Sequence, residues 1–107
     1  MTEIENNLRQ GLYKNNPHKC AEDKARLAGE YSFLSSQLES ILARKASTWL
    51  KLRETNNTDK ACDRAYEKTE DGINEMGLKL RLKSIDKMTS SLSSLIKIAE
   101  GEARNLY

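Results

Sequence analysis

Apolar residues recur at alternating intervals of four and three in the first half of the chain. This spacing is typical of an amphipathic helix of heptad type, and the residues that carry it are Leu27, Tyr31, Leu34, Leu38 and Ile41. Residues 19–54 contain no proline and a single glycine. The pattern therefore predicts one long helix over residues 19–54, about 50 Å in length at 1.5 Å per residue.

A second series runs through the last quarter of the chain, again in steps of three and four, and all its members except Glu102 are apolar. We expect it to face a second copy of the chain, and its apolar members are Ile85, Met88, Leu92, Leu95, Ala99 and Leu106. The arm that carries it is predicted over residues 59–107. Gly72 and Gly77 are the places where this arm would break, because glycine lowers helix propensity.

The polar segment 55–58 consists of residues that favour turns and helix caps, and it predicts the turn between the two long arms. Residues 1–18 predict a short helix that ends in a turn before Pro17, because the residue preceding a proline is disfavoured in a helix. The predicted fold class is therefore all-α. It is a long antiparallel helical hairpin with a short N-terminal helix, in a single domain over residues 1–107.

The amino-acid composition also favours a helical fold, and it indicates that the chain associates with copies of itself. The chain of 107 residues has five glycines and one proline, too few for an all-β fold with its frequent turns. Only 37% of its residues are hydrophobic, below the usual share of a globular domain, and a monomer of this size buries a modest part of its surface. We therefore expect a homo-oligomer, which would cover the apolar stripes.

Several classes of protein are excluded by what the sequence lacks. No apolar run is long enough to cross a bilayer, and the chain begins with an acidic segment where a signal peptide would be basic, so we expect a cytoplasmic protein without a membrane partner. Cys20 and Cys62 stand apart and His18 is the single histidine, which leaves no zinc site and no catalytic triad. We expect no enzyme activity and no cofactor.

An acidic cluster opens the second arm at helical spacings of three and four: Glu67, Glu70, Asp71 and Glu75. Such carboxylates could hold a divalent metal ion, but the Glu-x-x-His motif of di-iron helical bundles is absent. A solvated acidic face is the favoured interpretation, and no metal site is predicted.

The basic residues gather in two places. Around Trp49, with no acid between them, lie Arg44, Lys45, Lys51 and Arg53; a second cluster consists of Lys79, Arg81, Lys83 and Lys87. Cations that pair with phosphates, beside an aromatic ring that can stack on an unpaired base, favour single-strand binding. Trp49 also continues the apolar stripe of its helix, so it belongs either to the core or to the surface that binds bases.

Two short motifs resemble the phage recombination mediators of the UvsY type over residues 37–107. The first is Trp49-Leu50-Lys51-Leu52-Arg53, in which Lys51 and Arg53 match the Lys-x-Arg pair of that family. The second is Asp63-Arg64-Ala65-Tyr66-Glu67-Lys68-Thr69-Glu70, which matches with Ala65 inserted and Thr69 in place of serine. The linker between them is shorter than the glycine-rich one usual in the family.

The resemblance implies a small all-helical, ring-like homo-oligomer that binds single-stranded DNA. Such mediators help a RecA-like recombinase to displace the single-strand-binding protein. Lys51 and Arg53 would then contact phosphates, and the other predicted contacts are Arg44, Lys45, Trp49, Lys79, Arg81 and Lys83.

A rival hypothesis from another class is a phage interaction module that inhibits a host enzyme of defence or nucleic-acid metabolism. Its acidic face, residues 67–75, would imitate DNA phosphates.

Overall fold

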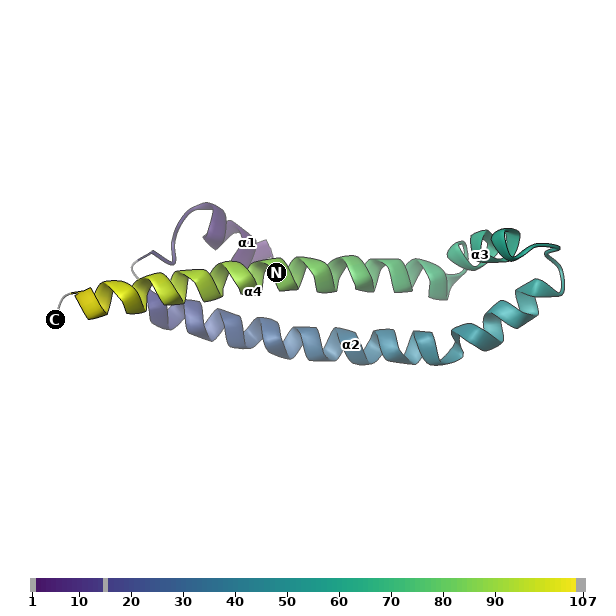
Figure 1. Cartoon of the computed structure of the whole chain (residues 1–107), viewed down its shortest axis with the longest axis horizontal. Coiled ribbons are helices and arrows are strands. Elements are labelled where there is room, and N and C mark those ends of the chain that lie inside the picture. The colour runs from purple at the N-terminus through teal and green to yellow at the C-terminus, as the bar shows by residue number, and fades with distance from the viewer. Residues whose placement is uncertain (1, 15, 106–107) are drawn as a thin grey trace. The chain divides into compact units, whose positions relative to one another are not determined.

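The computed structural model describes residues 2–14 and 16–105, and this part of the chain is all-helical. The described residues form four helices and no strand: α1 (Thr2–Arg9), α2 (Pro17–Arg53), α3 (Asp59–Glu67) and α4 (Glu70–Asn105). Figure 1 labels each helix along the chain. The predicted all-α class is confirmed. Leu106, a predicted residue of the oligomer interface, lies outside the described residues.

The chain divides into two compact units. Unit 1 consists of Met1–Tyr31 and Lys83–Tyr107, and unit 2 consists of Ser32–Leu82. The helices α2 and α4 contribute residues to both, whereas α1 belongs to unit 1 and α3 to unit 2.

Unit 1 encloses a small apolar core. Side chains from α1, from the loop after it and from α2 pack with side chains of α4, and the buried ones are Ile4, Tyr13, Cys20, Leu27, Ile85, Met88 and Leu92. The Cys20 thiol donates a hydrogen bond to the Leu92 carbonyl oxygen at 3.3 Å, so α2 and α4 approach closely at this level.

The N-terminal elements differ by a few residues from the prediction. Helix α1 ends at Arg9, and Gly11 follows in a left-handed conformation with φ +67°, which glycine adopts without strain. Helix α2 begins at Pro17 rather than at residue 19. The Asn16 side-chain oxygen accepts a hydrogen bond from the Lys19 backbone N–H at 3.1 Å, which makes Asn16 the N-cap and Pro17 the first helical residue.

Unit 2 holds the end of α2, all of α3 and the start of α4. Thr58 caps α3 by accepting from the Ala61 N–H at 3.1 Å, as the predicted turn over residues 55–58 requires. The second arm then breaks at residues 68 and 69, just before the predicted place. The reason is a second cap: the Thr69 hydroxyl accepts from the Gly72 N–H at 3.0 Å and starts α4.

Candidate nucleic-acid interface

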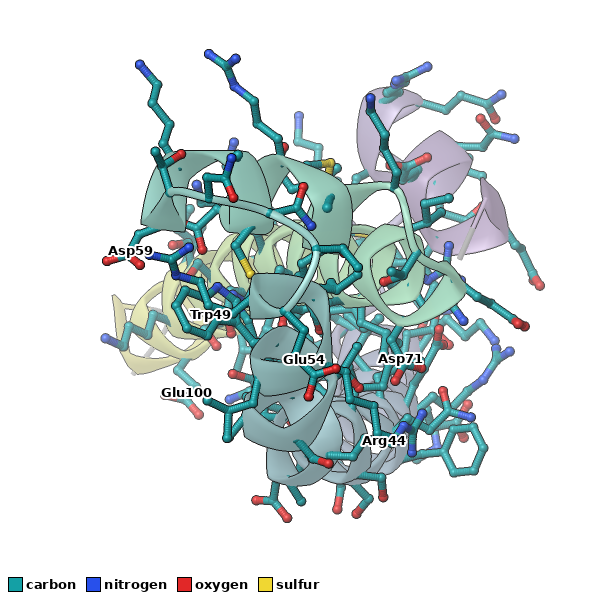
Figure 2. The ribbon with its side chains drawn as sticks, turned by 90° about the vertical axis from the view of Figure 1, so that its right-hand side faces the viewer. Arg44, Trp49, Glu54, Asp59, Asp71 and Glu100 are labelled. Carbon is teal, nitrogen blue, oxygen red and sulfur yellow. The ribbon has the colours of Figure 1, made fainter. Side chains whose placement is uncertain are left out.

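Arg44, one of the predicted phosphate contacts, is held by a carboxylate of the same unit. Its Nε lies 2.7 Å and its Nη2 2.9 Å from the two oxygens of Asp71, which is a bidentate pair (Figure 2). The hydrogen bond from the Arg44 guanidinium lowers the pKa of the Asp71 carboxyl below its ordinary value. The guanidinium also donates to the Ser40 carbonyl oxygen at 3.4 Å. Arg44 therefore joins α2 to α4 within unit 2.

Glu75 gathers two more of the predicted contacts around one buried carboxylate. Its oxygens lie 3.2 Å from Lys45 Nζ and 3.3 Å from Lys79 Nζ, and the Tyr66 hydroxyl donates to it at 3.2 Å. Lys45 also stands over the Tyr66 ring, 4.8 Å from its centroid. Only 8% of Glu75 is exposed. The four residues form a closed polar network in which every charge has a partner.

The pKa of Glu75 reflects two opposing effects. Burial by itself raises the pKa, but the hydrogen bonds and positive charges of Lys45 and Lys79 outweigh burial and lower it below its ordinary value. The pKa of Tyr66 moves up, because burial and the neighbouring Glu75 charge both disfavour the phenolate. At neutral pH Glu75 is therefore a carboxylate and Tyr66 a neutral phenol.

The lowered pKa of Glu75 predicts a loss of stability in acid. A carboxylate whose folded pKa lies below its unfolded value of about 4.3 stabilises the fold fully above that pH, and this stabilisation disappears as the pH falls through the folded pKa. We expect Glu75→Gln to melt at a lower temperature than the parent at pH 7, with the difference shrinking towards pH 3. Thermal melts followed by circular dichroism check this. A difference that stays constant over this range would contradict it.

Arg53 stabilises the turn that follows α2. Its Nε lies 3.1 Å from Asp59 Oδ1, and its Nη1 donates to the Asn56 carbonyl oxygen. The Asn56 side chain in turn donates to the Leu52 carbonyl oxygen at 2.7 Å. The predicted DNA contact at Arg53 is thus already occupied by groups of the turn.

Trp49 lies half-buried between α2 and α3. Its indole N–H donates to Asp63 at 2.8 Å, and its carbonyl oxygen accepts from the Cys62 thiol at 3.3 Å. Beside it is an open groove of about 500 Å³ lined also by Leu42 and Leu50. The sequence left the role of Trp49 open between core and base platform. The structure gives it a packing role at the α2–α3 junction, with a carboxylate at its polar edge.

The remaining predicted contacts are more open. Lys51 is exposed at the end of α2, and in the described part of the chain its side chain has no ion pair or hydrogen bond. The same holds for Lys83, which belongs to unit 1. Arg81 is exposed in unit 2. Of the predicted cations, the structure thus brings Arg44, Lys45 and Lys79 together, and it does so around acids.

The acidic cluster separates into two kinds of residue. Asp71 and Glu75 are the partners of cations just described, whereas Glu67 and Glu70 are exposed and make no ion pair among the described residues. Within the described range, no group of three His, Cys, Asp or Glu residues is placed to hold a metal ion. Half of the cluster is therefore structural.

The predicted oligomer stripe of α4 lies largely inside unit 1. Ile85, Met88 and Leu92 are 1%, 6% and 0% exposed, so a second copy could reach them only if the unit opened. Leu95 and Ala99 are half-buried and line a pocket of about 350 Å³ together with residues of α1 and the loop after it. The sequence pattern identified a buried face, and a face buried within one chain has the same periodicity as an interface.

Sequence reasoning missed a buried charge in unit 1. Asp23 is 1% exposed, accepts a hydrogen bond from the Tyr13 hydroxyl, and lies 3.4 Å from Lys19 Nζ and from Arg26 Nη1. Burial raises its pKa, but these donors and charges outweigh that effect and lower it. The spacings of four and three between Lys19, Asp23 and Arg26 were the available signal. This cluster fixes the loop containing Tyr13 onto α2.

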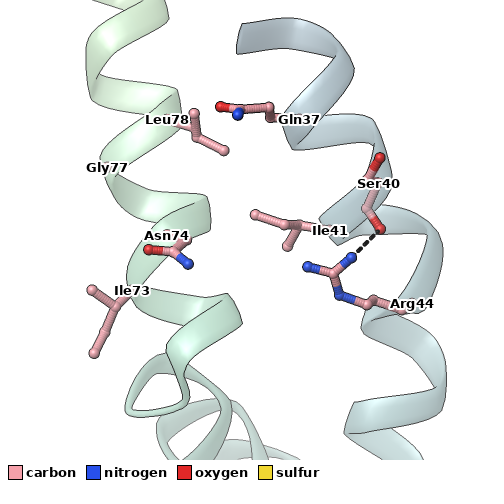
Figure 3. Close-up of a pocket in the computed structure, with 8 residues that line it drawn as sticks. All are labelled: Gln37, Ser40, Ile41, Arg44, Ile73, Asn74, Gly77 and Leu78. Atoms are coloured by element: carbon pink, nitrogen blue, oxygen red, sulfur yellow. Dashed lines mark hydrogen bonds between the residues drawn. The ribbon is translucent and has the colours of Figure 1, made fainter.

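An open groove between α2 and α4 lies within unit 2 (Figure 3). It has a volume of about 700 Å³, and among the residues that line it are Ser40 and Ile41 of α2 and Asn74 and Leu78 of α4. Ile73 lies at its edge and is 61% exposed. The groove is mixed in polarity, and Arg44 on its wall is already paired with Asp71.

Comparisons with known proteins give no relative. No protein family, no curated protein and no solved structure matches this chain.

Among the described residues, no helix is both long and apolar enough to cross a membrane.

Proposed function

We propose that the chain is a single-stranded-DNA-binding accessory protein of recombination or replication, a mediator that helps to load a RecA-like recombinase in place of a single-strand-binding protein. The observation that carries the proposal is Lys51. It is an exposed, unpaired cation in the motif that resembles the mediators, and the other three cations near this end of α2, Arg44, Lys45 and Arg53, are held by carboxylates.

Lys51 is a better phosphate contact than the neighbouring cations of α2 because its charge is not engaged in an ion pair. A phosphate that binds a cation already engaged in an ion pair must replace a carboxylate, which leaves that carboxylate without its partner. A phosphate that binds Lys51 displaces only water and counterions, whose release drives association. Lys51 is therefore the preferred phosphate contact on α2, and Lys45 and Arg44 support the fold.

Two matched variants separate these roles. Lys51→Ala is expected to weaken binding of a labelled oligo-dT and to lower the salt slope of the binding constant by about 0.7, the value for one phosphate contact with a single strand. Lys45→Ala is expected to leave the slope unchanged and to lower the free energy of unfolding by about 1 kcal/mol, because Glu75 loses a partner. Fluorescence anisotropy at several salt concentrations and thermal melts measure both.

The proposed contact at Lys51 fails if Lys51→Ala binds with the parent's slope. The proposed function fails if the parent does not bind oligo-dT at low salt.

Self-association is part of the proposal, and an exposed apolar stripe of unit 2 supports it. Ile73, Met76 and Leu80 follow one another at spacings of three and four on α4, and each is 57–63% exposed. Contiguous apolar side chains on one helix face are typical of interaction surfaces. Light scattering at micromolar concentration tests the proposal. A mass near 12.2 kDa, that of one chain, would contradict a homo-oligomer.

The interaction-module hypothesis draws on the same stripe and on the exposed carboxylates Glu67 and Glu70. Under that hypothesis the stripe would bind a host enzyme. It gains support if the parent is a monomer that does not bind oligo-dT at low salt.

A further inference from the structure

A row of three cations runs along the outer side of α3. Lys60, Arg64 and Lys68 are exposed, and in the described part of the chain their side chains have neither an ion pair nor a hydrogen bond. They are spaced by four residues, which brings successive side chains to the same side of a helix about 6 Å apart. Lys68 is the C-cap but keeps helical dihedral angles, φ −87° and ψ −12°, so it continues the row.

The buried residues of α3 show which way this row faces. Cys62 and Tyr66 are 0% and 3% exposed, and each lies two positions from members of the row, which is about 200° around a helix. The cations therefore face away from the side of α3 that packs within unit 2. Solvent surrounds them, and a ligand can reach all three.

The acids of α3 do not neutralise the row. Asp59 is bound by Arg53 at 3.1 Å, and Asp63 accepts from the Trp49 indole at 2.8 Å, so both are engaged by residues at the end of α2. Glu67 is exposed and has no ion pair with the row among the described residues. Thus α3 turns two of its carboxylates towards α2 and leaves its cations available.

We propose that the row formed by Lys60, Arg64 and Lys68 is a binding site for the phosphate backbone of single-stranded DNA. The inference rests on the proposed function and adds a second contact region to the one at Lys51. Three cations along one side of α3 suit a flexible single strand, which can bring successive phosphates to them. No exposed aromatic ring lies between them, which predicts binding without base preference.

The test compares two triple variants with the same net charge. The first changes Lys60, Arg64 and Lys68 to alanine. The control changes three exposed cations of unit 1 that belong to neither basic cluster, Arg9, Lys14 and Lys97, whose side chains also have no ion pair or hydrogen bond among the described residues. Both change the net charge from +2 to −1, since each removes three positive charges. Circular dichroism checks that both variants keep the parent's helical signal, which we expect because all six changed positions are exposed.

The row variant is expected to bind labelled oligo-dT at least about tenfold more weakly than the parent at low salt. Its salt slope should be smaller by about 2, the sum for three single-strand contacts at about 0.7 each. The control should keep the parent's slope.

Three possible results distinguish failure of the site on α3 from failure of the proposed function. Equal losses in both variants would overturn the site, because they would show an effect of net charge alone. A row variant that binds like the parent would overturn the site while leaving the proposed function standing. A parent without affinity for oligo-dT would overturn both. If the row variant unfolds, three single alanine variants replace it, and each should lower the slope by about 0.7.

Discussion

Replacing Gly72 by alanine is expected to destabilise unit 2 by about 3 kcal/mol, the upper end of the range for overpacking. A Cβ at this position would collide with the Tyr66 carbonyl oxygen and would lie 2.9 Å from the Glu67 Cα, both backbone atoms near the end of α3. Backbone cannot rotate away as a flexible side chain can. The break between α3 and α4 would therefore have to open, and the Tyr66 contact with Glu75 would be disturbed with it.

Gly77→Ala is the matched control in the same helix. A Cβ at Gly77 meets no atom within 4 Å, and alanine is favoured over glycine inside a helix by about 1 kcal/mol. Urea or thermal unfolding should therefore show Gly72→Ala less stable and Gly77→Ala more stable than the parent. Equal stability of the two variants would contradict the close approach of α4 to the end of α3 at Gly72.

Leu92→Asp is expected to unfold unit 1. The Leu92 side chain is fully buried. Replacing it with a carboxylate removes apolar contacts and buries a charge that has no cation or hydrogen-bond donor placed to receive it. The cost is on the order of 4 kcal/mol or more, comparable with the total stability of a small domain. Circular dichroism should show reduced helicity, and a melt should show loss of the cooperative transition. A variant with parental helicity and melting would contradict the burial of Leu92.

Leu80→Asp places the same change on the exposed stripe of unit 2. Leu80 is 63% exposed, so we expect parental helicity and a change in stability within about 0.5 kcal/mol, as for ordinary surface substitutions. If the stripe holds two copies together, this variant should have the mass of one chain in light scattering while the parent has a larger mass. A parental oligomer that persists in Leu80→Asp would exclude the stripe as its interface.

Several features of the fold followed from local sequence alone. The heptad spacing around Leu27 and Ile41 predicted a long helix, and both residues are buried in α2. Turn and cap chemistry over residues 55–58 predicted the end of that helix, because Thr58 can cap α3 whatever lies elsewhere. The break before α4 lies slightly earlier than the two glycines predict, because the Thr69 hydroxyl caps the start of α4.

The candidate site was only partly predictable. The sequence shows which residues are charged, and it identified the cations around Trp49 and the acids of the second arm separately. It could not show that Arg44 pairs with Asp71 or that Lys45 pairs with Glu75, because those partners are 27 and 30 residues apart. The spacing of four between Lys60, Arg64 and Lys68 is visible in the sequence. Only the structure shows that these cations are available to a ligand, because it shows which other cations are paired with carboxylates.

Features that depend on neighbours along the chain can be predicted without the structure: the helical class, the approximate helix ends and the apolar faces. Periodicity fixes which residues share a face, since the helix repeats every 3.6 residues. Tertiary packing sets which surface each apolar face contacts. It assigned Ile85, Met88 and Leu92 to a core within one chain, left Ile73, Met76 and Leu80 exposed, and paired Arg44 and Lys45 with acids, because these contacts arise only when distant segments of the chain pack together.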